Sequence, residues 1–183
     1  MIHLALCVVA VMTAISIVNA TAEVSWRTRL DQQLPLLGHR NWIVIADSAY
    51  PWQTAPGIET VWTAASQAEV VRAVLDTVSR ATHVRPIIYT DAELRAVPEA
   101  RSKGVEAYRE ELAKILAGRE VSVLPHEQII SKLDEAGKTF HVLLLKTKMT
   151  IPYTSVFLQL DCGYWSAEAE RELRETLKAT AKP

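Results

Sequence analysis

The chain has 183 residues, of which 49% are hydrophobic and 22% charged, and its formal net charge is −1. This composition is typical of one soluble α/β or α+β domain and excludes a chain that is disordered throughout. Because 20 Lys and Arg residues nearly balance 21 Asp and Glu residues, no net positive field attracts a polyanion, and nucleic-acid binding is not expected. A small neutral ligand fits this charge balance better.

The first 22 residues form an apolar segment without Asp, Glu, Lys or Arg. They end in Ala20-Thr21-Ala22, the small residues that signal peptidase requires. We predict a secretory signal over residues 1–22, a secreted or periplasmic protein, and a single domain over residues 23–183. Because no Lys or Arg precedes the apolar segment, an N-terminal membrane anchor is the alternative. After cleavage no membrane association is expected, and Cys162 is the one cysteine left, so no intramolecular disulfide can form.

Helical and strand patterns alternate along the rest of the chain, which predicts a layered α/β sheet. The clearest strand is Trp42–Ala46, a continuous apolar run that indicates burial on both faces. Ser66 and Glu69 form a capping signature ahead of an apolar helical stripe. Helices are expected over 26–37, 66–78, 103–117, 125–136 and 168–181, with a short one begun by residues 90–93. Strands are expected over 42–46, 59–62, 84–89, 121–124, 141–146 and 156–160.

Several motifs that mark common enzyme classes are absent from the sequence. It contains no G-x-G-x-x-G, Walker A, G-x-S-x-G, H-E-x-x-H or C-x-x-C pattern, so nucleotide-binding, α/β-hydrolase, zincin and thioredoxin functions have no support. The histidines at 39, 83, 126 and 141 share no metal-ligand spacing, and one unpaired cysteine cannot form a structural zinc site. No metal site is predicted.

Polar residues stand at the ends of predicted strands, where ligands of α/β sheets gather. His39 precedes the strand 42–46, Asp47 follows it, and His126 follows the strand 121–124. Two histidines and one aspartate suit acid–base chemistry near neutral pH. Each residue also has a simpler explanation: a solvated turn for His39, a turn cap for Asp47, and the first helical residue for His126.

Three segments resemble the D-ribose pyranase and L-fucose mutarotase family (RbsD/FucU). The stretch 37–47, with Leu-Gly-His, an apolar strand and an Asp, is similar to the N-terminal signature of that family. His126-Glu127-Gln128 after a strand resembles its ribose-type branch, and residues 152–158 resemble the Tyr-x-Asn that precedes its last strand. The resemblance implies an RbsD-like, three-layer α/β/α fold with a mixed central sheet, to which residues from about 163 onward add a helical extension.

The family interconverts ring forms of free monosaccharides without a cofactor or metal. By resemblance, His39 matches the catalytic general acid, and Asp47, His126, Tyr153 and Ser155 match sugar-binding positions. Opening a hemiacetal ring removes a proton from the anomeric hydroxyl and delivers one to the ring oxygen, which an imidazole with an ordinary pKa of about 6.5 can do. Ser155 stands where the family has Asn, so its hydrogen bonds to a sugar must differ.

The resemblance and these residues together imply two candidate functions. The first is a monosaccharide mutarotase or pyranase, favoured by the joint presence of His39, Asp47 and His126. The alternative is a non-catalytic protein that binds a sugar or another small polar ligand on the same fold, favoured by Ser155 and by the bulky segment 48–52. A hydrolase is disfavoured because no nucleophile stands in an activated context.

The separation between His39 and Asp47 bears on the assembly of the site. They are eight residues apart, and the strand between them rises roughly 3.3 Å per residue. Their Cα atoms should therefore lie about 20 Å apart, unless the turn at Gly38 folds back sharply. One small sugar cannot contact both residues in one subunit. We therefore predict a homo-oligomer with sites between subunits, and the resemblance implies the same, since the family forms ring-shaped homo-oligomers.

Overall fold

The computed structural model describes residues 25–180; the predicted secretory signal lies outside them. The helices are α1 (Trp26–Gln33), α2 (Gln67–Ser79), α3 (Val105–Ile115), α4 (His126–Gly137) and α5 (Ala167–Thr180), with short 3-10 helices at Leu34–Leu36 and Ala92–Arg95. The strands are β1 (Trp42–Ala46), β2 (Ile58–Trp62), β3 (Val84–Asp91), β4 (Val121–Leu124), β5 (Val142–Lys146) and β6 (Val156–Cys162). Every helix and strand expected from the sequence pattern is present, with bounds that differ by a few residues.

The six strands form one sheet in the order β2-β5-β1-β6-β3-β4. Strand β6 is antiparallel to both its neighbours, β1 and β3, whereas the other neighbouring pairs are parallel. The carboxyl ends of β1 to β5 therefore share one edge of the sheet, and β6 starts at that same edge. The predicted mixed central sheet is confirmed.

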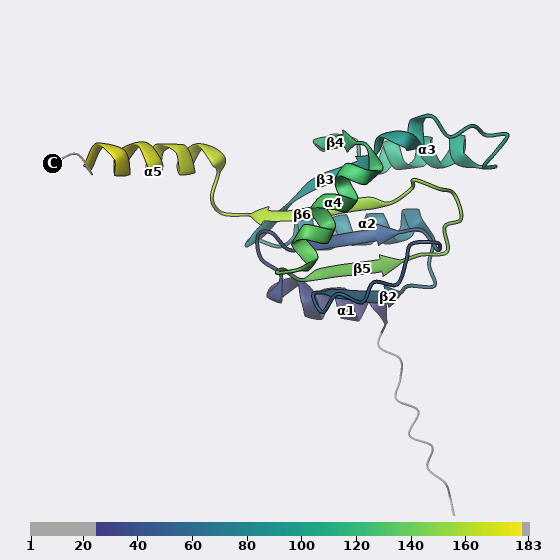
Figure 1. Cartoon of the computed structure of the whole chain (residues 1–183), viewed down its shortest axis with the longest axis horizontal. Helices are drawn as coiled ribbons and strands as arrows, with labels where there is room; N and C mark the ends of the chain where they lie inside the picture. Colours follow the sequence, from purple (N-terminus) through teal and green to yellow (C-terminus); the bar gives the residue numbers. More distant parts are fainter. Residues whose placement is uncertain (1–24, 181–183) are drawn as a thin grey trace, which may run out of the picture.

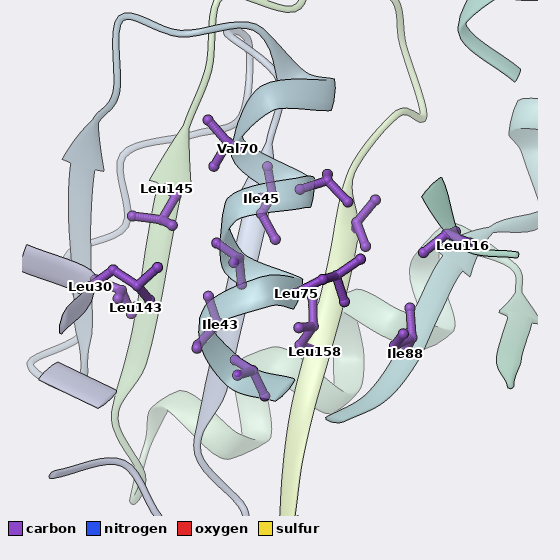
Figure 2. Packing of buried hydrophobic residues seen from close by; sticks show 14 of the residues in the cluster. Leu30, Ile43, Ile45, Val70, Leu75, Ile88, Leu116, Leu143, Leu145 and Leu158 are labelled. Carbon is purple, nitrogen blue, oxygen red and sulfur yellow. The ribbon is translucent and has the colours of Figure 1, made fainter. Parts of the chain in front are cut away.

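Helices cover both faces of this sheet (Figure 1). All five residues of β1 are buried, as expected for a strand covered on both sides. Because side chains alternate along a strand, Ile43 and Ile45 pack under α2 (Figure 2), whereas Val44 packs in a second cluster with Ile129 and Leu133 of α4. These two apolar clusters, one on each face, establish the predicted three-layer α/β/α arrangement.

The start of α2 follows the capping pattern seen in the sequence. The Oγ of Ser66 accepts a hydrogen bond of 3.3 Å from the backbone N–H of Glu69. This bond satisfies one of the N–H groups that have no partner within the helix. It fixes the first turn of α2, and with it the position of Gln67, against the carboxyl edge of the sheet.

Helix α5 occupies the predicted C-terminal extension and lies apart from the sheet, beyond the end of β6 (Figure 1). None of its residues is buried. Within residues 25–180, no helix has both the length and the apolar character needed to cross a membrane.

Candidate functional site

Four residues with ionisable side chains lie at the carboxyl edge of the sheet. Asp47 follows β1, Asp91 ends β3, His126 begins α4 directly after β4, and Tyr153 lies just before β6. A cavity of about 380 Å³ opens at this edge. Its lining includes Asp47, Tyr50, His126, Glu127, Ile130 and Tyr153. The structure thus brings together three of the five residues singled out in the sequence, namely Asp47, His126 and Tyr153.

The Asp47 side chain caps a turn and also borders the cavity. Its Oδ1 accepts a hydrogen bond of 2.8 Å from the backbone N–H of Ala49, which is the turn-capping role that the sequence also allowed. The side chain still borders the cavity. Among the residues that the structure describes, none donates a hydrogen bond to Oδ2, so this oxygen is available to a ligand hydroxyl.

His126 is held at its backbone and at its ring. Its backbone N–H donates to both carboxylate oxygens of Glu93, each 3.0 Å away, and a carboxylate at this position also interacts favourably with the N-terminus of α4. The ring Nδ1 lies 3.1 Å from Oδ1 of Asp91. Glu93 and Asp91 therefore fix the residue from the 3-10 helix and from β3.

Asp91 is the most deeply buried carboxyl group at the site, with a side chain that is 0% exposed. Burial raises its pKa to about 6, and the neighbouring His126 opposes part of that rise. The sequence pattern assigned Asp91 to the start of a short helix, but β3 continues through it, so its carboxyl group lies at a strand end. An Asp directly after an apolar run, as at Asp47, was the signal that could have identified it.

Tyr153 packs edge-on against the imidazole of His126, with 5.6 Å between the ring centroids and 79° between the planes. Its φ is +58°, a left-handed conformation that non-glycine residues seldom adopt. Holding a non-glycine residue in this conformation costs free energy, so the conformation persists only where the surrounding structure imposes it. The conformation of Tyr153 therefore depends on the contacts of the loop that carries it.

Tyr50 is a further residue at the cavity, and no motif in the sequence marks it. Its side chain is buried, and this burial, reinforced by the charge of Asp134, raises the pKa of the phenol. The hydroxyl therefore stays protonated and can donate a hydrogen bond at neutral pH. The Nζ of Lys146 donates to the Tyr50 carbonyl oxygen over 2.6 Å, which anchors the loop that follows β1.

His39 lies at the opposite edge of the sheet, at the amino end of β1. It borders a second hollow of about 770 Å³, together with His83, Arg85 and Asp161. The two hollows share no lining residue, so a single chain keeps His39 apart from the cavity that holds Asp47 and His126.

Ser155 is only 2% exposed, immediately before β6, and is not among the residues that line the cavity. Its predicted contact with a sugar stays a prediction. Across residues 25–180, no group of three or more His, Cys, Asp or Glu residues is arranged to hold a metal ion.

Comparison with solved structures identifies the fold. The structure of Bacillus subtilis RbsD complexed with D-ribose matches this chain with a TM-score of 0.52 and 20% sequence identity, over 82% of this chain and 98% of that one. The chain has an RbsD-like fold. A fucose mutarotase from Streptococcus pneumoniae, in complex with L-fucose, is similar with a TM-score of 0.48 and 17% identity, over 75% of this chain and 93% of that one.

No protein-family model matches the sequence, and no curated protein does. The RbsD-like fold expected from three short segments is confirmed, and the activity has to be argued from the site.

Proposed function

We propose that this protein is a monosaccharide mutarotase or pyranase that interconverts the ring forms of a free sugar. One observation carries the proposal: the three sequence-matched residues Asp47, His126 and Tyr153 converge on one cavity of about 380 Å³, a volume within the range of small-molecule sites. The RbsD-like fold supports it, because the similar structure from Bacillus subtilis is a complex with D-ribose.

The side chains fit the proton transfers of this reaction. Ring opening breaks the bond between the anomeric carbon and the ring oxygen while one proton leaves the anomeric hydroxyl and another reaches the ring oxygen. Ring closure reverses both transfers, so no cofactor is consumed. His39 acts as the general acid, and Asp47 and Tyr153 hold sugar hydroxyls through hydrogen bonds.

A complete site requires two copies of the chain. The cavity at the carboxyl edge lacks His39, which borders the other hollow. A homo-oligomer in which the amino edge of one subunit meets the carboxyl edge of another supplies His39 to the cavity. The protein acts outside the cytoplasm, after removal of residues 1–22, on a sugar present in that compartment.

A non-catalytic protein that binds sugars is the second candidate. It is favoured by the position of Ser155, which is buried and outside the cavity and so gives a sugar fewer polar contacts there than the sequence pattern led us to expect. Such a protein would bind a monosaccharide in the same cavity without changing the rate at which its ring forms exchange.

Exchange NMR on free pentoses and hexoses separates the two candidates. We expect the purified protein to accelerate the exchange between ring forms of at least one sugar, and His39→Ala to abolish the acceleration. His141→Ala is the matched control, because His141 borders neither hollow. Binding without acceleration would establish the binding protein instead. Neither binding nor acceleration across the panel would overturn both candidates.

A further inference from the structure

Asp91 is a buried carboxyl group with almost no polar neighbours. Neither of its oxygens is within hydrogen-bond geometry of a donor in residues 25–180. Its one close polar neighbour is Nδ1 of His126, 3.1 Å from Oδ1 but outside the geometry of a formal hydrogen bond. Burying an ionised carboxylate without partners is costly. The contact with His126 is therefore the one interaction that offsets the cost of burying this carboxyl group.

The same contact determines which ring nitrogen of His126 faces the cavity. Nδ1 is buried against Asp91, whereas the side chain as a whole is 29% exposed and borders the cavity. The two nitrogens lie on different sides of the imidazole. With Nδ1 directed at Asp91, Nε2 is the nitrogen that remains for a ligand.

Further contacts restrict the ring to this orientation. The Glu93 carboxylate holds the backbone N–H of His126, and the ring of Tyr153 packs edge-on against the imidazole. The ring is thus restrained by its backbone, by an aromatic neighbour and by Asp91, which come from separate segments. A catalytic base needs this restraint, because misplacement by about 1 Å can cost a large part of the rate.

We propose that Asp91 is a positioning residue that holds His126 as the tautomer protonated on Nδ1, so that Nε2 presents its lone pair to a ligand hydroxyl in the cavity. A carboxylate that accepts from Nδ1–H fixes this tautomer and stabilises the imidazolium that forms when Nε2 takes up a proton. The role in turnover rests on the proposed function; the tautomer does not.

In the proposed reaction this arrangement makes His126 the proton acceptor. The anomeric hydroxyl gives its proton to Nε2 of His126, and the electron pair of the O–H bond forms the new carbonyl. The bond from the anomeric carbon to the ring oxygen breaks, and its electron pair goes to the ring oxygen, which takes a proton from His39. Reclosure returns both protons, so atoms and charge balance over the cycle.

Nitrogen-15 NMR of the histidine side chains, recorded without any sugar near pH 8, tests the tautomer directly. In the wild-type protein we expect the Nδ1 of His126 to have the shift of a protonated nitrogen and Nε2 that of an unprotonated one. In Asp91→Asn, which keeps the shape but removes the charge, we expect the population to move towards the Nε2–H form. Asp76→Asn makes the same chemical change at an exposed position of α2 and should leave the His126 shifts unchanged.

The wild-type spectrum decides the inference even if Asp91→Asn fails to fold. A wild-type His126 protonated on Nε2 rather than on Nδ1 would overturn it. So would an Asp91→Asn protein that folds and keeps the wild-type shifts. Since no sugar is present, these outcomes do not depend on whether the proposed function is correct.

Kinetics then test the link to turnover, with the sugar found in the exchange experiment. Asp91→Asn should slow catalysed exchange about 100-fold, the lower end of what a positioned acid–base group contributes. Sugar affinity, measured by NMR titration, should change far less, because Asp91 does not line the cavity. An equal loss of rate and affinity would indicate a merely structural role and overturn the positioning role.

Discussion

The side-chain nitrogen of Gln67 donates a hydrogen bond of 2.9 Å to the carbonyl oxygen of Thr154, the residue after Tyr153. The same nitrogen donates to the carbonyl oxygen of Ile45 near the end of β1 over 3.0 Å, and the hydroxyl of Thr147 donates to the other end of the amide. Gln67 is fully buried. One amide therefore connects the start of α2, the end of β1 and the loop that carries Tyr153.

We predict that Gln67→Leu destabilises the protein and disturbs the cavity. The substitution leaves polar groups of Ile45, Thr154 and Thr147 with fewer partners, and a buried polar group without its hydrogen bond costs about 1–3 kcal/mol. The free energy of unfolding should fall by about 3 kcal/mol in urea denaturation. Gln32→Leu, at an exposed position of α1, should change it by less than about 0.5 kcal/mol. Equal stabilities of the two variants would contradict this role of Gln67.

The sequence determined most of the fold because its apolar periodicity is strong. The run Trp42–Ala46 predicted a strand covered on both faces, and the structure places an apolar cluster on each side of it. Periodicity carries no information about strand direction. The mixed sheet was expected only from the family resemblance, and the antiparallel orientation of β6 was not predicted. Hydrophobic patterns decide which residues are buried, whereas strand direction depends on how the connections cross the sheet.

The candidate site was predictable in part. Asp47, His126 and Tyr153 were identified from local segments, and the rise per residue of a strand placed His39 far from Asp47. Asp91 was missed because β3 runs to the aspartate itself, two residues beyond its predicted end. The left-handed backbone of Tyr153 also has no signature in the sequence, since tertiary contacts impose it.

A second prediction concerns the histidines. We expect His126→Ala to weaken sugar binding by about 1 kcal/mol, roughly the contribution of one hydrogen bond to a neutral group, because its ring borders the cavity. His141→Ala should not affect binding, since His141 lies near Glu59, with 3.7 Å between Nε2 and Oε2, away from the cavity. NMR titration with the sugar measures both effects. Comparable losses in the two variants would count against a role for His126 at the site.

The shared site leads to a complementation experiment. His39→Ala and Asp47→Ala should each be inactive alone. When subunits of the two variants are mixed by unfolding and refolding together, about a quarter of the interfaces in a randomly mixed oligomer should combine an intact His39 with an intact Asp47. Exchange NMR should then detect partial recovery of the catalysed rate. A wild-type protein that is fully active as a monomer, or mixed oligomers without any recovery, would refute a site completed by two subunits.

The burial of Asp91 makes stability depend on pH in a direction that can be stated in advance. Its side chain is fully buried and faces the ring of His126 and the charges of Glu93 and Asp47, and its pKa is raised to about 6. The folded protein therefore holds the Asp91 proton more tightly than the unfolded chain does. By linkage, this group's contribution to stability is fully present below its unfolded pKa of about 4 and is lost as the pH rises through about 6.

We predict that wild-type protein loses stability relative to Asp91→Asn as the pH rises from 4 to 7. The neutral carboxamide does not ionise, so the variant lacks this loss, and the difference should amount to on the order of 2 kcal/mol. Urea denaturation of both proteins at pH 4 and pH 7, at one ionic strength, measures it. Comparing the two proteins cancels the titration of groups that they share, and Asp76→Asn should follow the wild type at both pH values. If the wild type instead gains stability relative to Asp91→Asn with rising pH, then the contact with His126 outweighs burial and Asp91 is already ionised in the folded protein at pH 4.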